Sequence, residues 1–151
     1  MDADLRELYQ EIILDHSRHP RHFGALADAN HVAEGYNPLC GDKVKIYLKL
    51  DDADRIADIA FEGKGCAISV ASASLMSEML KGRSTEEAEQ LLSGFLHLVK
   101  GEDASDLEED DKEHLAVMAG VSAFPMRVKC ATLAWHAMKA AIDGEESAKS
   151  E

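Results

Sequence analysis

Apolar residues recur at helical spacing in several parts of the chain. In the first such stretch, Asp4–His16, they fall three and four positions apart on one face, which predicts an amphipathic helix. Ser84, with Glu87 three residues later, forms a capping-box pattern at the start of another helix. Helices are expected over residues 4–16, 67–81, 84–95, 115–119 and 125–142.

Strands are predicted between the first two helices. Apolar and polar residues alternate over 43–50, and after a short acidic turn the chain returns over 55–62. A further short strand is expected over 31–36. In the returning strand, the side chains of Ala57, Ile59 and Phe61 are expected to face inward. The order of elements predicts an α+β fold, a small three-stranded antiparallel sheet with helices packed on one face.

The length indicates a single domain. A chain of 151 residues buries roughly two-thirds of its unfolded surface without a disulfide or a metal to hold it together. We expect the domain to span residues 1–144 and the polar segment 145–151 to be a disordered tail.

The charge balance excludes several partners. The chain has 16 Lys and Arg against 29 Asp and Glu, a net charge of -13, so binding to nucleic acid is not expected. No window reaches the roughly 18 apolar residues of a membrane span, and the start lacks a basic signal-peptide pattern. A cytoplasmic protein is expected.

Two segments are dense in titratable residues. From Glu102 to Glu113, eight acidic residues stand against one lysine, which favours a solvated linker and helix face. His16, His19 and His22 follow one another at three-residue spacing around Pro20, which ends the first helix. We interpret these histidines as a solvated helix end near the negative pole of the helix dipole, not as metal ligands.

Three cysteines and one aspartate are the candidate chemical groups. Cys40 and Asp42 flank a glycine in a tight turn, and Cys66 and Cys130 lie near expected helix starts. An odd number of widely spaced cysteines without an export signal favours reduced thiols over disulfides. Three thiolates and a carboxylate suit zinc, and equally suit iron with sulfide. From the residues alone, Cys66 and Cys130 are as readily interpreted as small buried side chains.

Three segments resemble the cysteine motifs of the U-type iron-sulfur cluster assembly proteins. They are Asn37–Asp42 (NPLCGD), Gly63–Ser69 (GKGCAIS) and Arg127–Trp135 (RVKCATLAW). In that family the IscU-type scaffolds have a histidine directly before the third cysteine, where this chain has Lys129. The segment between the second and third cysteines is also longer here than in IscU-type chains. Both features resemble the SufU branch.

The resemblance implies a zinc-dependent sulfurtransferase. It implies that Cys40, Asp42, Cys66 and Cys130 bind one zinc ion and that the protein accepts persulfide sulfur from a SufS-like cysteine desulfurase, which holds the pyridoxal phosphate. Downstream iron-sulfur assembly proteins are the expected receivers. We expect Cys40 to be the sulfur acceptor, because it lies on a turn that can move. Arg127 matches a SufU arginine and is a candidate to pair with Asp42 when the metal geometry changes.

The same residues are also compatible in type with three other functions. The first is a scaffold that assembles a [2Fe-2S] cluster on the same four side chains and passes it on. The second is a structural zinc module that only docks partners, which predicts unfolding on metal removal. A hydrolytic zinc enzyme is disfavoured, because four candidate ligands leave no position for a catalytic water.

Overall fold

The computed structural model describes residues 3–38, 40–105 and 107–149. Its elements run in the order α1 (Ala3–Arg18), β1 (His31–Asn37), β2 (Asp42–Leu50), β3 (Ile56–Lys64), α2 (Ala67–Leu80), α3 (Thr85–Val99), α4 (Glu109–Leu115), the 3-10 helix η1 (Ala116–Ala123), α5 (Pro125–Ile142) and β4 (Ser147–Lys149).

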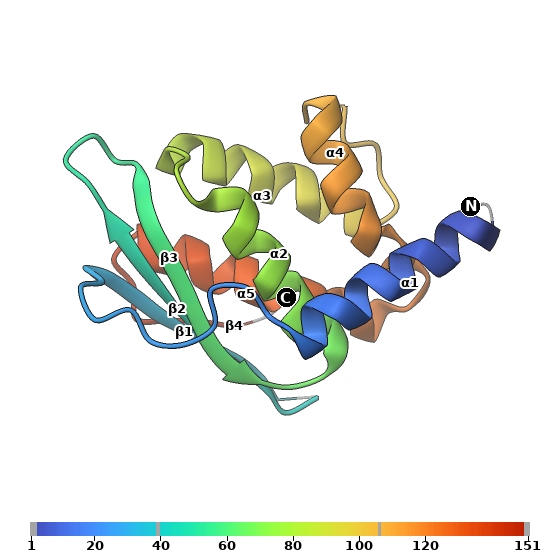
Figure 1. Cartoon of the computed structure of the whole chain (residues 1–151), viewed down its shortest axis with the longest axis horizontal. Helices are drawn as coiled ribbons and strands as arrows, with labels where there is room; N and C mark the ends of the chain where they lie inside the picture. Colours follow the sequence, from blue (N-terminus) through green and yellow to red (C-terminus); the bar gives the residue numbers. More distant parts are fainter. Residues whose placement is uncertain (1–2, 39, 106, 150–151) are drawn as a thin grey trace.

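Strands β1, β2 and β3 form an antiparallel sheet with β2 in the centre. Helix α5 packs against β1 and β2, α2 packs against β3, and α1 lies against α2 (Figure 1). The α+β fold with a three-stranded antiparallel sheet and helices on one face is therefore confirmed. In the described part of the chain, no helix combines the length and apolar character needed to cross a membrane.

The C-terminal segment adds a short edge strand. Strand β4 pairs in parallel with β1, and the Glu34 N–H donates to the Glu146 carbonyl at 2.9 Å. An exposed strand edge carries unpaired backbone groups, and β4 pairs with those of β1. This strand lies within the segment for which the sequence predicts disorder; residues 150–151 lie outside the described residues. The domain boundary at residue 144 stays a prediction.

One inward-facing residue was assigned wrongly. Ile59 and Phe61 are buried as expected, but Ala57 is exposed and its neighbour Ile56 is buried. The register between β2 and β3 shifts at Lys49 and Leu50, so that β3 has one extra residue there. Such a bulge reverses the in-out alternation beyond it, which strict alternation cannot predict.

Serines and alanines let α2 approach α5 closely. The Ser72 hydroxyl donates to the Ala131 carbonyl at 2.6 Å, and the Trp135 indole N–H donates to the same hydroxyl oxygen at 3.1 Å. Trp135 is fully buried and stacks on Phe95, with ring centroids 4.7 Å apart. Buried polar groups that are fully hydrogen-bonded specify a single arrangement, so this contact fixes how α2 and α5 lie against each other.

The histidine in the last turn of α1 is not solvated. His16 is buried, and its Nδ1 lies 2.7 Å from the Ser74 hydroxyl of α2. Burial lowers the pKa of His16, which favours the neutral ring. The expectation of a solvated helix end was wrong here, because the end of α1 packs on the serine-rich face of α2.

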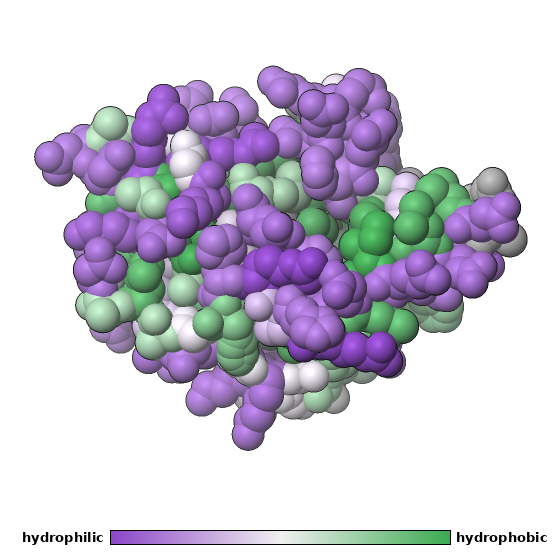
Figure 2. All heavy atoms as spheres, in the orientation of Figure 1, coloured by the Kyte–Doolittle hydropathy of each residue, from purple (hydrophilic) through white to green (hydrophobic). Residues whose placement is uncertain are grey.

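The acidic segment is in part folded onto the domain. Figure 2 shows a hydrophilic surface over α4, as the charge run predicts. However, Asp111 is buried and accepts from Arg83 through both carboxylate oxygens, at 2.7 and 3.3 Å. A Cβ at Gly94 of α3 would overlap the Leu107 side chain, so this glycine makes room for the segment. The interpretation as a solvated linker is therefore incomplete.

We predict that Asp111→Ala lowers the free energy of unfolding by about 1 to 3 kcal/mol, because it leaves the Arg83 guanidinium without its charged partner. Urea unfolding followed by circular dichroism measures the loss. Asp110→Ala is the matched control, since Asp110 is exposed on the same helix and its replacement should stay within about 0.5 kcal/mol. Equal effects of the two substitutions would show that the ion pair does not hold α4.

Candidate metal centre

The turn between β1 and β2 carries the first thiol. Asn37 and Asp42 pair at its base, and the Gly41 N–H donates to the Asn37 carbonyl at 2.9 Å. Gly41 has φ +73°, a conformation that glycine adopts without strain and that bends the chain sharply between Cys40 and Asp42. Cys40 is exposed on this turn. The motif residue Leu39 lies outside the described residues.

Asp42 ties the start of β2 to the start of α2. Its carboxylate is fully buried, and Oδ1 accepts from the Cys66 backbone N–H at 2.9 Å. Cys66 is the N-cap residue of α2, as the sequence predicted. The Cys66 thiol lies 3.7 Å from the second oxygen, Oδ2. One oxygen therefore anchors the helix start, while the other faces the thiols.

The third thiol enters from α5. Cys130 is buried, and its Sγ lies 3.7 Å from the Cys40 Sγ. Its neighbour Ala131 accepts the Ser72 hydroxyl described above, which positions this part of α5 relative to α2. The Cys40 sulfur, an Asp42 carboxylate oxygen and the Cys130 sulfur all lie within 4.8 Å of one another. Three segments remote in sequence thus converge at one end of the sheet.

Glycines give the carboxylate its space. A Cβ on Gly65 would overlap the Asp42 carboxylate, with the Asp42 Cγ only 2.8 Å away. A Cβ on Gly63 would collide with the Lys43 carbonyl and approach the Val44 Cα to 3.0 Å. Glycine at both positions therefore lets the end of β3 pass close to Asp42.

The thiols shape the electrostatics of the site. Burial, followed by hydrogen bonds with Asp42 and Cys66, raises the pKa of the Cys130 thiol. The coulombic attraction of the Cys66 and Cys130 sulfurs in their ionised form raises the pKa of Arg127, whose guanidinium lies beside them. The pairing of Arg127 with Asp42 stays a prediction.

The structure brings the four predicted ligands together. Cys40, Asp42 and Cys130 form one group, and Cys66 touches Asp42. Three sulfurs and one carboxylate oxygen are a donor set that suits zinc. Because a bound cation displaces thiol protons, it offsets the burial that otherwise keeps Cys130 protonated. The sequence reasoning missed the anchoring role of Asp42 and the role of Gly65, although a glycine directly before a helix-start cysteine is a usable signal.

The chain is similar to known proteins over most of its length. Residues 8–131 match the family described as NifU-like N terminal domain. The chain is 40% identical to the zinc-dependent sulfurtransferase SufU of Bacillus subtilis over 145 residues, 96% of each chain. It is 42% identical to the iron-sulfur cluster assembly scaffold protein IscU of Streptococcus pyogenes, covering 97% of this chain and 90% of that protein. The crystal structure of FiSufU from Fervidobacterium islandicum superposes with a TM-score of 0.81 at 33% identity, covering 93% of this chain and 99% of that one.

We predict that Gly65→Ala weakens zinc binding about 10- to 100-fold, because the added methyl group displaces the Asp42 carboxylate. Competition with a chromophoric chelator measures the affinity. Gly120→Ala is the control, since a Cβ there meets nothing within 4 Å. Unchanged affinity in a folded Gly65→Ala protein would show that the position of Asp42 does not matter for binding.

Proposed function

The chain belongs to the family of NifU-like N terminal domains, and on that premise we propose that it is a zinc-dependent sulfurtransferase of iron-sulfur cluster assembly. The observation that carries the proposal is the convergence of Cys40, Asp42 and Cys130 within 4.8 Å, with Cys66 against Asp42. The relative named as a zinc-dependent sulfurtransferase, similar over 96% of its length, supports the same function.

The proposed zinc ligands are Cys40, Asp42, Cys66 and Cys130. Bound zinc would keep the thiols deprotonated at neutral pH without itself exchanging electrons. Three thiolates and a carboxylate bring four negative charges to the site, and the guanidinium of Arg127 beside Cys66 and Cys130 offsets part of them. We propose that Arg127 also pairs with Asp42 when a ligand is released.

Cys40 is the proposed sulfur acceptor. Among the three thiols it alone is exposed, whereas Cys66 is half-buried and Cys130 is buried on α5. In the proposed step the Cys40 thiolate attacks the outer sulfur of a donor persulfide. A bond forms between the Cys40 Sγ and that sulfur, the donor S–S bond breaks, and the donor cysteine leaves as a thiolate. No separate base is required, because the attacking group is already ionised.

The proposed sulfur donor is a cysteine desulfurase. A SufS-like enzyme would hold pyridoxal phosphate and carry the persulfide, and downstream iron-sulfur assembly proteins would receive the sulfur. The proposal places this exchange in the cytoplasm, where thiols stay reduced.

A second candidate is the scaffold function. It is favoured by the relative named as an iron-sulfur cluster assembly scaffold protein, which is 42% identical to this chain. The same four side chains would then hold a [2Fe-2S] cluster, since three thiolates and a carboxylate also suit iron. Lys129, which stands where IscU-type chains have a histidine, favours the sulfurtransferase.

We predict that Cys40→Ser retains the fold but loses the stimulation of the partner desulfurase, because serine cannot accept the sulfur. The rate of alanine release from cysteine measures the stimulation, and circular dichroism checks the fold. Ala57→Ser introduces the same side chain at an exposed position on β3 and should stimulate like the unmodified protein. Full stimulation by Cys40→Ser would move the acceptor role to another residue.

We predict that the purified protein contains about one zinc per chain and that a chelator removes the metal without unfolding the chain. The buried core on one face of the sheet, which includes Phe61, Phe95 and Trp135, is large enough to hold the fold. Metal analysis and far-UV circular dichroism before and after chelation test both points. Unfolding on chelation would favour the structural zinc module, and a stable visible-absorption spectrum after anaerobic reconstitution with iron and sulfide would favour the scaffold.

A further inference from the structure

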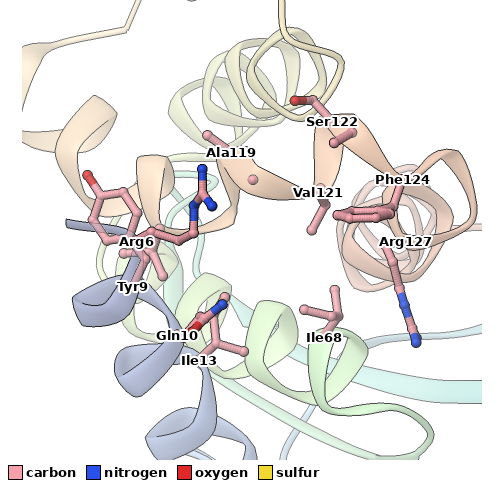
Figure 3. A pocket seen from close by; sticks show the side chains of 13 residues that line it. Arg6, Tyr9, Gln10, Ile13, Ile68, Ala119, Val121, Ser122, Phe124 and Arg127 are labelled. Carbon is pink, nitrogen blue, oxygen red and sulfur yellow. The ribbon is translucent and has the colours of Figure 1, made fainter. Parts of the chain in front are cut away.

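A groove runs between α1 and η1 and is closed at one side by Ile68 of α2 and by Phe124, which precedes α5. It encloses a volume of about 720 Å³ and is mainly apolar, with Ile13, Ile68, Val121 and Phe124 in its walls. Figure 3 shows Arg6 extending from α1 toward η1, while Ile68 and Phe124 project toward the cavity from the opposite side. A cavity of this size with an apolar lining and few polar groups is typical of a binding site.

The groove favours a negatively charged occupant. Among the described residues that line it, the charged ones are Arg6 and Arg127. The acidic residues of the same part of α1, at positions 4, 7 and 11, lie on a different stripe of the helix from Arg6, Gln10 and Ile13. Since the Arg127 guanidinium lies beside Cys66 and Cys130, Arg6 is the charged group that faces the groove, and it is complementary to a carboxylate of an acidic segment.

Exposed apolar side chains lie at the groove and elsewhere on α1. Phe124 lines the groove and is 62% exposed, whereas Leu5 and Leu8, 38% and 49% exposed, lie on another stripe of α1 from Arg6, Gln10 and Ile13. Figure 2 shows hydrophobic residues gathered over α1, beside the hydrophilic surface of α4. A large apolar side chain as exposed as Phe124 at the edge of the groove favours a protein segment as its occupant.

The groove adjoins the thiols. Arg127 lines it with its stem while its guanidinium lies beside Cys66 and Cys130, and Ile68 comes two residues after Cys66. A protein segment held in the groove therefore lies beside the thiol site.

We propose that this groove docks an apolar, acidic segment of the protein that delivers sulfur to Cys40. The inference rests on the proposed function and adds to it the surface and the chemistry of recognition. An apolar side chain of the donor would fill the cavity beside Phe124, and a neighbouring carboxylate would pair with Arg6. Docking by this groove is separate from the chemistry of the thiols.

The test uses Arg6→Glu and Phe124→Ser, two exposed positions whose replacement should not disturb the core. The probe is the cysteine desulfurase of the same organism, titrated with each variant while the rate of alanine release is followed. Each substitution should raise the concentration of this protein needed for half-maximal stimulation by about tenfold and leave the maximal rate unchanged. The zinc content should also be unchanged.

Two substitutions on the same helix serve as controls. Arg18→Glu makes the same charge reversal and Leu14→Ser the same apolar-to-polar change at exposed positions outside the groove. Both should stimulate like the unmodified protein. Added sodium chloride should weaken stimulation by the unmodified protein more than by Arg6→Glu, because the variant has already lost the attraction.

The outcomes separate the two proposals. If the unmodified protein stimulates the desulfurase and both groove variants match it at every concentration, the groove proposal is overturned and the sulfurtransferase stands. If the unmodified protein does not stimulate the desulfurase at all, the proposed sulfurtransferase function is overturned, and the groove proposal, which rests on it, is overturned as well. A dimer in sedimentation that Arg6→Glu dissociates would assign the groove to a second copy of the chain and overturn the proposal.

Discussion

The hydrogen bond between the Asp42 carboxylate and the Cys66 backbone N–H is the constraint on which the site depends. It joins the first residue of β2 to the N-cap residue of α2, two positions 24 residues apart in the chain. A buried carboxylate is stable only when it is hydrogen-bonded or paired, and the amide at the helix start meets part of that need. Since Oδ1 is occupied in this way, Oδ2 is left facing the sulfurs.

The same bond explains why glycines surround the site. The end of β3 and the loop after it can pack closely against the start of β2, which includes Asp42, because Gly63 and Gly65 have no side chains. On the other side, the contact of Ser72 with Ala131 and Trp135 sets the distance between α2 and α5, and thereby places Cys130. The site is therefore a product of close backbone approach, and its precision comes from small residues as much as from the ligands.

Much of the fold could be predicted from the sequence, because helix caps and strand alternation depend on residues that are close together in the chain. The Ser84–Glu87 capping box is formed with both of its hydrogen bonds, and the alternation over β2 identified its buried residues Val44, Ile46 and Leu48. The burial of His16 and the Arg83–Asp111 pair could not be predicted, because each depends on a partner distant in sequence, and the bulge at Ala57 breaks the alternation on which the strand prediction relied. For the site, the spacing of the cysteines alone left zinc ligands and buried side chains equally open, and only the resemblance favoured convergence. The groove has no sequence motif, since its walls come from separate elements.

The graded burial of the three thiols has a kinetic consequence. Among the three thiols, Cys130 on α5 is buried, Cys66 is half-buried and Cys40 is exposed. In the proposed zinc site, Cys40 would be the ligand on the open side, where an ion has to enter and leave. Oxidants and alkylating reagents in the solvent reach the exposed sulfur first, so chemical damage would begin at Cys40 and reach the sulfurs of Cys66 and Cys130 later.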